Sequence, residues 1–422
     1  MNEAFSETVD WIEPERAFAP FRTQDGALLL HGGQRSASRL YALPVDTLTF
    51  RQGDDLSVLL QKARGALADG HQLAGLFSYE FGHVLEPRTG LPPPGRPLVQ
   101  LGVYPAWAVF DPVSRTLTLQ GVDDGRRRLR ACLEEGQPLP QPARGDLEPG
   151  WSREAYLAAC RTMIEHIRAG DIYQANLSQG FSGHLTGDPW SVFLRLLERS
   201  DAPHAAWLRA SDDHVVMTNS PERFLRLKGG FVESRPIKGT RPRKSDPAAD
   251  RAEAEALAAS EKDRAENLMI VDLVRNDISR VCRPGSVKVP QLNTVESYAN
   301  VHHLVSTVTG QLAEGRDALD LILASFPAGS ITGAPKIRAM ELIREAEGEA
   351  RGAYCGALGW IGYSGQSMDL NVMIRTLDLI RTDTDWQVKA RSGGAITIDS
   401  DPAEEYDETL HKLSALRAAL EG

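Results

Sequence analysis

Residues 263–277 read Asp-Arg-Ala-Glu-Asn-Leu-Met-Ile-Val-Asp-Leu-Val-Arg-Asn-Asp and form the second half of a helix that we predict from Asp246 to Cys282. At about 100° per residue, Glu266 and Asp277 point into the middle of its apolar face. A carboxylate on a buried face is costly unless it is paired, hydrogen-bonded or bound to a cation. The pattern therefore predicts either a salt bridge to a core arginine or a cation site. The apolar face comprises Met269, Ile270, Leu273 and Val274, with Asp272 and Arg275 on the opposite side.

A second stretch, Pro236-Ile237-Lys238-Gly239-Thr240-Arg241-Pro242-Arg243, sets one lysine among arginines on what we expect to be a stiff loop. The prolines restrict the backbone, and the glycine permits a close approach to another group. Partial burial or cationic neighbours such as Arg235 and Arg241 would lower the pKa of Lys238 and free its amine for nucleophilic attack. The alternative is a solvated basic loop.

A third stretch, Asp399–Glu408, is acidic, and Ser400 or Asp401 is expected to cap a helix with a proline in its first turn. Acids at this place complement the helix dipole, and Glu408 is expected to pair with Lys412. Acids on two separate helices are also what a Mg²⁺ site needs when the substrate supplies further oxygens.

Two stretches rich in small residues are weaker signals. Gly329–Lys336 resembles a phosphate-binding loop, but it lacks the Walker A spacing, and Pro335 removes an amide where phosphate would bind. Ser392–Ala395 is expected to be a loop whose exposed amides could hold a carboxylate. Adjacent glycines such as Gly393 and Gly394 are equally consistent with a simple tight turn.

The composition restricts the class of protein. The chain has 422 residues, 42% of them hydrophobic, and can bury a large core. Its net charge of −10 argues against nucleic-acid binding. No apolar run is long enough to span a membrane, the acidic N-terminus lacks a signal-peptide core, and the cysteines show no CxxC spacing. We therefore expect a soluble cytoplasmic enzyme that acts on small anions.

The order of the predicted elements indicates an α+β fold with antiparallel sheets, because strands and helices do not alternate strictly. A segment rich in Pro and Gly at 136–145 is the best linker candidate, between an N-terminal part (1–145) and a second part (150–422). The elements expected are strands at Ala27–His31, Val103–Phe110, Val215–Thr218, Phe224–Leu227 and Ala395–Ile398, and helices at Ser57–Ala68 and from the cap Ser152 to about Ala169.

Taken together, these stretches resemble the chorismate-utilising enzymes, a family that includes the anthranilate, aminodeoxychorismate, isochorismate and salicylate synthases. The resemblance extends in collinear order over roughly residues 150–415, so chance is a poor explanation. The matching blocks are Asp171–Leu177, Ser220–Phe224, 236–243, Asp263–Asn267, Arg275–Asp277, His302–Ser306, Gly329–Lys336, Arg351–Tyr354, Ile374–Arg375, Gly393–Ala395 and Glu405–Thr409.

The resemblance implies two packed antiparallel sheets surrounded by helices, a chorismate site and a Mg²⁺ ion. Glu266 and Glu405 match the metal-binding acids. The positions that match groups holding substrate carboxylates are Tyr354, Arg375, Gly393, Gly394 and Lys412. The resemblance also places His303 and Ser330 near the ring and the departing hydroxyl, and Glu222 as general acid or base. Alone, Glu222 could instead be a helix-start or salt-bridge residue.

Two positions discriminate among the reactions of the family. Gln174 stands where isochorismate and salicylate synthases carry a water-activating lysine, so water addition is disfavoured. Lys238 stands where anthranilate synthases usually carry alanine and where the aminodeoxychorismate synthases carry a lysine. The resemblance therefore implies attack of Lys238 on C2 of chorismate and amination at C4 by ammonia. Anthranilate synthesis, which also eliminates pyruvate, is the alternative.

The resemblance also implies a partner. No Gly-x-Cys-x-Gly glutaminase element is present, since Cys355 lies in Ala353-Tyr354-Cys355-Gly356. We therefore expect a separate glutamine amidotransferase subunit to supply ammonia. Leu29-Leu30-His31-Gly32 replaces the Leu-Leu-Glu-Ser element of tryptophan-inhibited anthranilate synthases, so we expect little inhibition by tryptophan.

Overall fold

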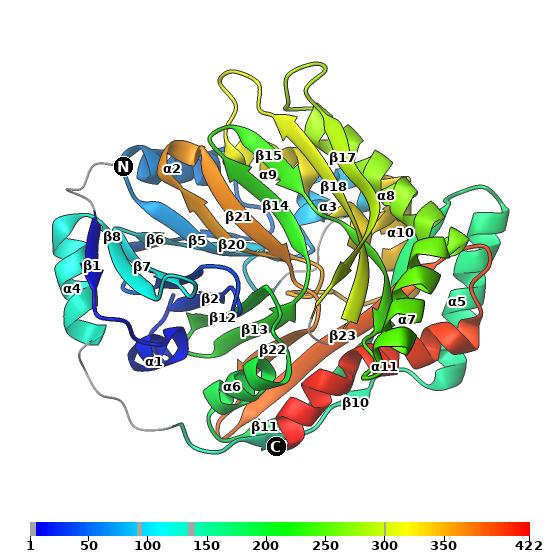
Figure 1. Ribbon diagram of the computed structural model, residues 1–422, viewed down its shortest axis with the longest axis horizontal. Helices are drawn as coiled ribbons and strands as arrows, with labels where there is room; N and C mark the ends of the chain where they lie inside the picture. Colours follow the sequence, from blue (N-terminus) through cyan, green and yellow to red (C-terminus); the bar gives the residue numbers. More distant parts are fainter. Residues whose placement is uncertain (1–5, 91–94, 134–139, 299–300) are drawn as a thin grey trace.

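The computed structural model describes residues 6–90, 95–133, 140–298 and 301–422. Its strands form two large antiparallel sheets, with helices around them (Figure 1). The α+β architecture predicted from the order of the elements is confirmed. Both sheets combine strands from the N-terminal part of the chain with strands from the second part.

Within the described residues, the first sheet has 13 strands. In spatial order these are β1 (Ser6–Val9), β8 (Thr116–Gly121), β7 (Ala106–Asp111), β3 (Ser38–Tyr41), β2 (Leu28–His31), β12 (His204–Ser211), β13 (His214–Ser220), β22 (Thr376–Arg381), β23 (Trp386–Ile396), β11 (Gln174–Thr186) and β10 (Glu148–Pro149), while β19 (Gly333–Ala334) and β9 (Arg144–Gly145) also pair with β11.

The second sheet has 10 strands in the part of the chain that the structure describes. Their order is β16 (Ile237–Pro242), β18 (Val301–Gln311), β15 (Phe231–Ser234), β14 (Arg223–Lys228), β21 (Ser367–Val372), β20 (Ala357–Gly362), β5 (Gln72–Phe77), β6 (Val99–Tyr104) and β4 (Asp46–Phe50), and β17 (Lys288–Ser297) pairs with β18.

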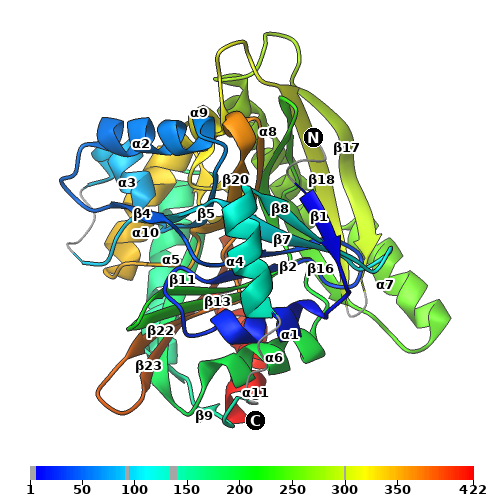
Figure 2. The same cartoon turned by 90° about the vertical axis from the view of Figure 1, so that its left-hand side faces the viewer.

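The helices cover the outer faces of the sheets; α4, for example, lies against β7 and β8 (Figure 2). The described α-helices are α1 (Pro14–Phe18), α2 (Leu56–Ala68), α3 (Phe81–Leu85), α4 (Asp123–Leu133), α5 (Arg153–Arg168), α6 (Pro189–Arg199), α7 (Pro247–Ala259), α8 (Glu261–Ser279), α9 (Ala318–Ser325), α10 (Lys336–Glu347) and α11 (Pro402–Glu421). Short 3₁₀ turns are η2 (Ala19–Phe21), η3 (Pro87–Thr89), η4 (Gly329–Ile331) and η5 (Tyr363–Gly365).

The two sheets pack against each other through a shared apolar layer. Leu28, Trp107 and Leu208 of the first sheet belong to the same buried cluster as Leu76 and Leu358 of the second. Two larger clusters lie on the outer sides, one between the second sheet and α2, α8 and α9, the other between the first sheet and α1, α6 and α11. Within the described residues, no helix combines the length and apolar character that a membrane span requires.

Three local predictions need correction. The strand predicted over Val103–Phe110 is two strands, β6 and β7, which belong to different sheets and separate at Pro105. Proline lacks the amide that a continuous ladder would use. The helix predicted from Asp246 to Cys282 is divided into α7 and α8 at Ser260, whose backbone is extended and whose hydroxyl caps α8. The strand predicted at Ala395–Ile398 ends at Ile396.

The other predicted elements are present with small shifts of their ends. Ser152 caps α5 by accepting a hydrogen bond from the amide of Ala155, and Asp401 caps α11 with a proline in its first turn. The linker predicted at 136–145 lies in part outside the described residues, and Arg144–Gly145 of it forms β9.

Candidate active site

Lys238 lies on strand β16 and not, as predicted, on a loop. The pairing of β16 with β18 shifts register between Ile237 and Thr240, so the strand is irregular at the lysine. Gly239 there has φ of +79°, and a Cβ atom at this position would lie 2.9 Å from the Asp263 carboxyl carbon. The irregular strand thus lets α8 approach closely. The Lys238 ammonium donates a hydrogen bond to the Ser330 carbonyl at 3.2 Å.

The surroundings of Lys238 favour the neutral amine. Burial lowers the pKa of Lys238, and the nearby Lys412 acts in the same direction, while Glu266 and Glu222 oppose the shift. The lowered pKa and its largest cause, burial, agree with the prediction. The cationic neighbour that contributes is Lys412, in place of the expected Arg235 and Arg241. Arg235 forms an ion pair with Glu296, and Arg241 lies 3.5 Å from Asp263, so the charges of both arginines are compensated by acids.

Glu222 lies between β13 and β14 and is buried. Burial raises the pKa of Glu222 to about 7, although hydrogen bonds from the Ser330 hydroxyl and the Ile237 amide and the charge of Lys238 act in the opposite direction. A carboxyl group with this pKa is suited to both donating and accepting a proton at neutral pH. It forms no salt bridge within the described residues, which disfavours the salt-bridge alternative.

Ser330 joins Lys238 and Glu222 through η4. A Cβ atom at the preceding Gly329 would lie 2.7 Å from the Leu273 Cδ2 atom, so α8 packs directly against this turn. The backbone carbonyl of Ser330 contacts Lys238, and its side chain contacts Glu222. Three predicted catalytic residues from distant parts of the sequence therefore meet. We call Glu222, Lys238 and Ser330 the lysine cluster.

His303 lies on β18, with its Nδ1 atom 2.9 Å from the Thr240 hydroxyl. Burial and the charge of Arg375 lower the pKa of His303 to about 4, so the imidazole is neutral at neutral pH. His303 can therefore serve as a neutral hydrogen-bonding group but not as a permanent cation.

Arg375 follows β21 and has a left-handed backbone, with φ of +52°. Burial lowers its pKa. Its guanidinium forms no ion pair or hydrogen bond with another described residue, which is unfavourable for a partly buried cation. A planar guanidinium of this kind matches a carboxylate ligand. Tyr354 is also buried; burial raises the pKa of its hydroxyl, which hydrogen-bonds to Asn176 and stays protonated.

Glu405 lies in the first turn of α11, and its two carboxylate oxygens differ. Oε1 accepts a hydrogen bond from the Ser400 hydroxyl at 2.7 Å, whereas the buried Oε2 has no partner within the described residues. Gly394 faces this oxygen, because a Cβ atom there would lie 2.7 Å from it. Burial raises the pKa of Glu405, and the neighbouring Glu408 acts in the same direction.

Glu266 lies on the buried face of α8, as predicted, and is 8% exposed. Its carboxylate makes no hydrogen bond or ion pair with another described side chain. Burial raises the pKa of Glu266. The charges of Lys238 and Lys262 lower it, and the charge of Glu408 raises it. Lys262 and Glu408 also shift the pKa of Glu405, so the same two charges influence both acids.

These acids fit a divalent cation that takes further ligands from elsewhere. The unpartnered oxygen of Glu405 and the unpaired carboxylate of Glu266 are hard oxygen donors of the type that Mg²⁺ prefers. In the described part of the chain, no three His, Cys, Asp or Glu side chains gather closely enough to hold a metal by themselves. Any cation bound here would therefore need oxygens from water or a substrate.

Residues 392–395 are not the loop that we predicted; they belong to strand β23. Gly393 lies opposite Ser178 and Gly394 opposite Leu177 on β11. A Cβ atom at Gly393 would lie 2.2 Å from the Leu177 carbonyl, so this glycine is required by the close approach of β11. Lys412 donates to the Gly393 carbonyl at 2.8 Å and, as predicted, pairs with Glu408 at 2.6 Å.

Asp277, the second acid on the buried face of α8, has a structural partner. Its carboxylate lies 2.6 Å from the Lys336 ammonium, which also donates to the Ser325 carbonyl at 2.9 Å. The salt-bridge alternative is thus correct for Asp277, which pairs with Lys336 and, at 3.7 Å, with Arg280. The ion pair with Asp277 also gives Lys336, at the end of the stretch Gly329–Lys336, a structural role that needs no phosphate.

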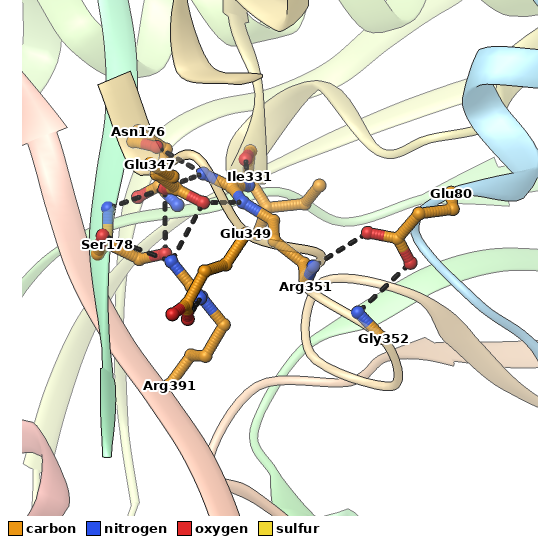
Figure 3. A network of polar contacts seen from close by, with 9 residues as sticks. All are labelled: Glu80, Asn176, Ser178, Ile331, Glu347, Glu349, Arg351, Gly352 and Arg391. Atoms are coloured by element: carbon orange, nitrogen blue, oxygen red, sulfur yellow. Dashed lines mark hydrogen bonds and ion pairs between the residues drawn. The ribbon is translucent and has the colours of Figure 1, made fainter. Parts of the chain in front are cut away.

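A buried polar network around Glu347, missed by the sequence reasoning, reaches Ile331, the neighbour of Ser330 in η4 (Figure 3). The Glu347 carboxylate accepts hydrogen bonds from Ser178, Arg351 and Arg391. Arg351 also donates to the carbonyls of Asn176 and Ile331. It thereby fixes the turn that carries Ser330 against β11. The only signal in the sequence was the position of Arg351 in one of the matching blocks.

Comparisons with known proteins show which family and which relatives the chain is similar to. The family model described as chorismate binding enzyme matches residues 26–418. Aminodeoxychorismate synthase component 1 of Salmonella typhimurium is 40% identical over 96% of this chain and 96% of its own length. Anthranilate synthase component 1 of Streptomyces coelicolor is 38% identical over 97% of this chain and 87% of its own length. The crystal structure of anthranilate synthase component I from Streptococcus pneumoniae superposes with a TM-score of 0.79 and 29% identity, covering 90% of this chain and 92% of that one.

Proposed function

The chain belongs to the family of chorismate binding enzymes, and we propose that it aminates chorismate at C4 to give 4-amino-4-deoxychorismate. The observation that carries the proposal is the lysine cluster, in which an amine with a lowered pKa lies beside a carboxyl group with a raised pKa. Such a pair is suited to supplying a nucleophile and a proton donor.

In the first step, the neutral Lys238 amine forms a bond to C2 of chorismate. The two ring double bonds each shift by one position, and the C4–O bond breaks. Glu222 gives its proton to the departing hydroxyl, which leaves as water. Covalent attack by an anchored amine divides one difficult displacement into two easier steps.

In the second step, ammonia forms a bond to C4, the double bonds shift back, and the C2–N bond breaks. Lys238 leaves as a neutral amine. The new C4 ammonium group returns one proton to Glu222, so the enzyme regains its starting state. Arg375 is suited to holding a substrate carboxylate throughout, with Tyr354 and His303 as neutral hydrogen-bonding groups beside the ring.

Glu266 and Glu405 would hold a Mg²⁺ ion together with a carboxylate of the substrate. When bound, the cation would neutralise that carboxylate and polarise the ring to which it is attached. The unpartnered oxygen of Glu405 supports this assignment.

A separate subunit is the expected source of ammonia. The relative from Salmonella typhimurium is named a component 1, which supports a partner for this chain as well. We propose that the partner is a glutamine amidotransferase, and that ammonium salts at high concentration substitute for it.

The alternative is anthranilate synthesis. Overall identity does not separate the two activities, because the aminodeoxychorismate and anthranilate synthase relatives are 40% and 38% identical to this chain. Lys238 favours C4 amination, since an alanine at its position would offer no nucleophile.

The experiment is a product analysis of the purified chain with chorismate, Mg²⁺ and an ammonium salt. We expect a product that an added lyase converts to 4-aminobenzoate, and Lys238→Ala should lose at least about a hundredfold in rate while keeping its fold. Anthranilate with pyruvate as the product, or a fully active Lys238→Ala, would overturn the proposal.

A further inference from the structure

A small cavity lies behind Glu222, between β14, α8 and the segment that follows α9. Its volume of about 10 Å³ is close to the smallest space that accommodates one water molecule. Most of the lining is apolar, including Phe224, Val274 and Ile278. Its polar members include Glu222, Asp277, Ser325 and Ser330.

Ser325 gives independent evidence that a polar molecule belongs in this cavity. It is the last residue of α9 and is 2% exposed, and its hydroxyl oxygen has no hydrogen-bond partner within the described residues. Its backbone carbonyl accepts a hydrogen bond from the Lys336 ammonium, so this lysine does not satisfy the hydroxyl. A buried hydroxyl without a partner is unfavourable, and an ordered water molecule is the usual remedy.

The charged groups around Glu222 come from three directions. Lys238 faces it from β16. Asp277 on α8 also lines the cavity, and its charge is compensated by Lys336 at 2.6 Å and by Arg280 at 3.7 Å. The next residue on β14, Arg223, is bound to Asp369 at 3.0 Å. Partners compensate the charges of Asp277 and Arg223. These charges therefore do not offset the effect of an additional hydrogen-bond donor on the Glu222 carboxylate.

We propose that this cavity holds one ordered water molecule, which donates a hydrogen bond to the Glu222 carboxylate and accepts one from the Ser325 hydroxyl. Ser325 is then a positioning residue that acts on the acid–base group through the water molecule. The water stabilises the ionised form of Glu222 and limits how far burial raises its proton affinity. This inference rests on the proposed function, in which Glu222 transfers the proton.

The first test is a high-resolution crystal structure of the unaltered chain. We expect one density peak in the cavity within hydrogen-bonding distance of both Glu222 and Ser325. The second test is the pH dependence of kcat/KM, in which the ionisation of Glu222 is identified by its disappearance in Glu222→Gln. In Ser325→Ala we expect this ionisation to move upward by about one pH unit, because the water loses a partner and the carboxylate loses a donor.

Two further variants separate this effect from a change in packing. Ser325→Thr keeps the hydroxyl and should retain the original profile. Ser279→Ala, which alters an exposed serine on α8, should also leave it unchanged. An empty cavity in the crystal structure, or identical profiles for Ser325→Ala and the unaltered chain, would overturn the inference. A fully active Glu222→Gln would instead overturn the role of Glu222 in the proposed function, whatever the cavity holds.

Discussion

Two sets of buried glutamates differ in their hydrogen-bond partners and in the direction of their pKa shifts. Behind the site, both carboxylate oxygens of Glu347 are occupied by Ser178, Arg351 and Arg391, and these partners lower its pKa. In the site, Glu405 keeps one unpartnered oxygen and Glu266 has no ion pair, and burial raises the pKa of both.

The difference shows which acids are available to a ligand. Glu347 is satisfied by the protein, so its charge contributes to holding β11, β23 and α10 together. The two site acids remain unsatisfied, which is costly in the free protein and becomes favourable only when a cation or substrate is bound. The same contrast exists on the buried face of α8, where Asp277 has an ion-pair partner and Glu266 has none within the described residues.

The largest effect on stability is expected for Glu347→Gln. The substitution would leave two buried guanidiniums without their shared counter-charge and should lower the free energy of unfolding by about 3–5 kcal/mol. Chemical denaturation measures this loss. Glu349→Gln is the matched control, because Glu349 is 71% exposed and lies 3.6 Å from Arg391; it should change stability by less than about 1 kcal/mol. Equal losses in the two variants would contradict the comparison.

Glu222→Gln should make the folded protein more stable at alkaline pH. The pKa of Glu222 is raised from 4.5 to about 7, so the folded state binds the proton more tightly than the unfolded state. Stability from this group is present below the unfolded pKa and is lost as the pH rises through about 7. The variant should therefore gain up to about 3 kcal/mol at pH 8 and show a flatter pH dependence of stability. An unchanged slope between pH 5 and 8 would show that Glu222 is not protonated by burial.

Glu405→Gln should remove the response to Mg²⁺ without unfolding the protein. At a Mg²⁺ concentration of about a hundred times Kd, binding should stabilise the unaltered chain by about 2.7 kcal/mol, measured as a rise in the thermal midpoint. The variant should show no such rise, since a neutral amide is a poor ligand for Mg²⁺. Glu404→Gln alters the exposed neighbour and should retain the rise. A loss of the response in Glu404→Gln alone would reassign the metal ligand.

The smallest effect is expected for Lys412→Gln. Lys412 is half exposed and already bound to Glu408 and the Gly393 carbonyl, so its removal should change stability by less than about 1 kcal/mol. Because Lys412 helps to lower the pKa of Lys238, amination near neutral pH should fall less than about tenfold, and the optimum should move to higher pH. A loss as large as that of Lys238→Ala would show that Lys412 binds the substrate directly.

Much of the site could be predicted from the sequence, because it depends on the spacing and the types of the residues. Helix periodicity was sufficient to place Glu266 and Asp277 on the buried face of α8, and the acidic stretch gave the cap of α11 and the Glu408–Lys412 pair. The collinear blocks gave the family and the α+β class. These features are local, or repeat a known order along the chain.

Other features depend on contacts between distant segments, and only the tertiary structure decided them. The sequence does not distinguish Asp277 from Glu266, because the shorter of the two salt bridges of Asp277 comes from Lys336, which is 59 residues away. The amine of Lys238 is governed by burial and by Lys412, since folding gives the neighbouring arginines acidic partners of their own. Likewise, Gly393 and Gly394 lie on a strand because β11 pairs there. Residue type determined which chemistry was available, and packing determined which acids and amines were left free to perform it.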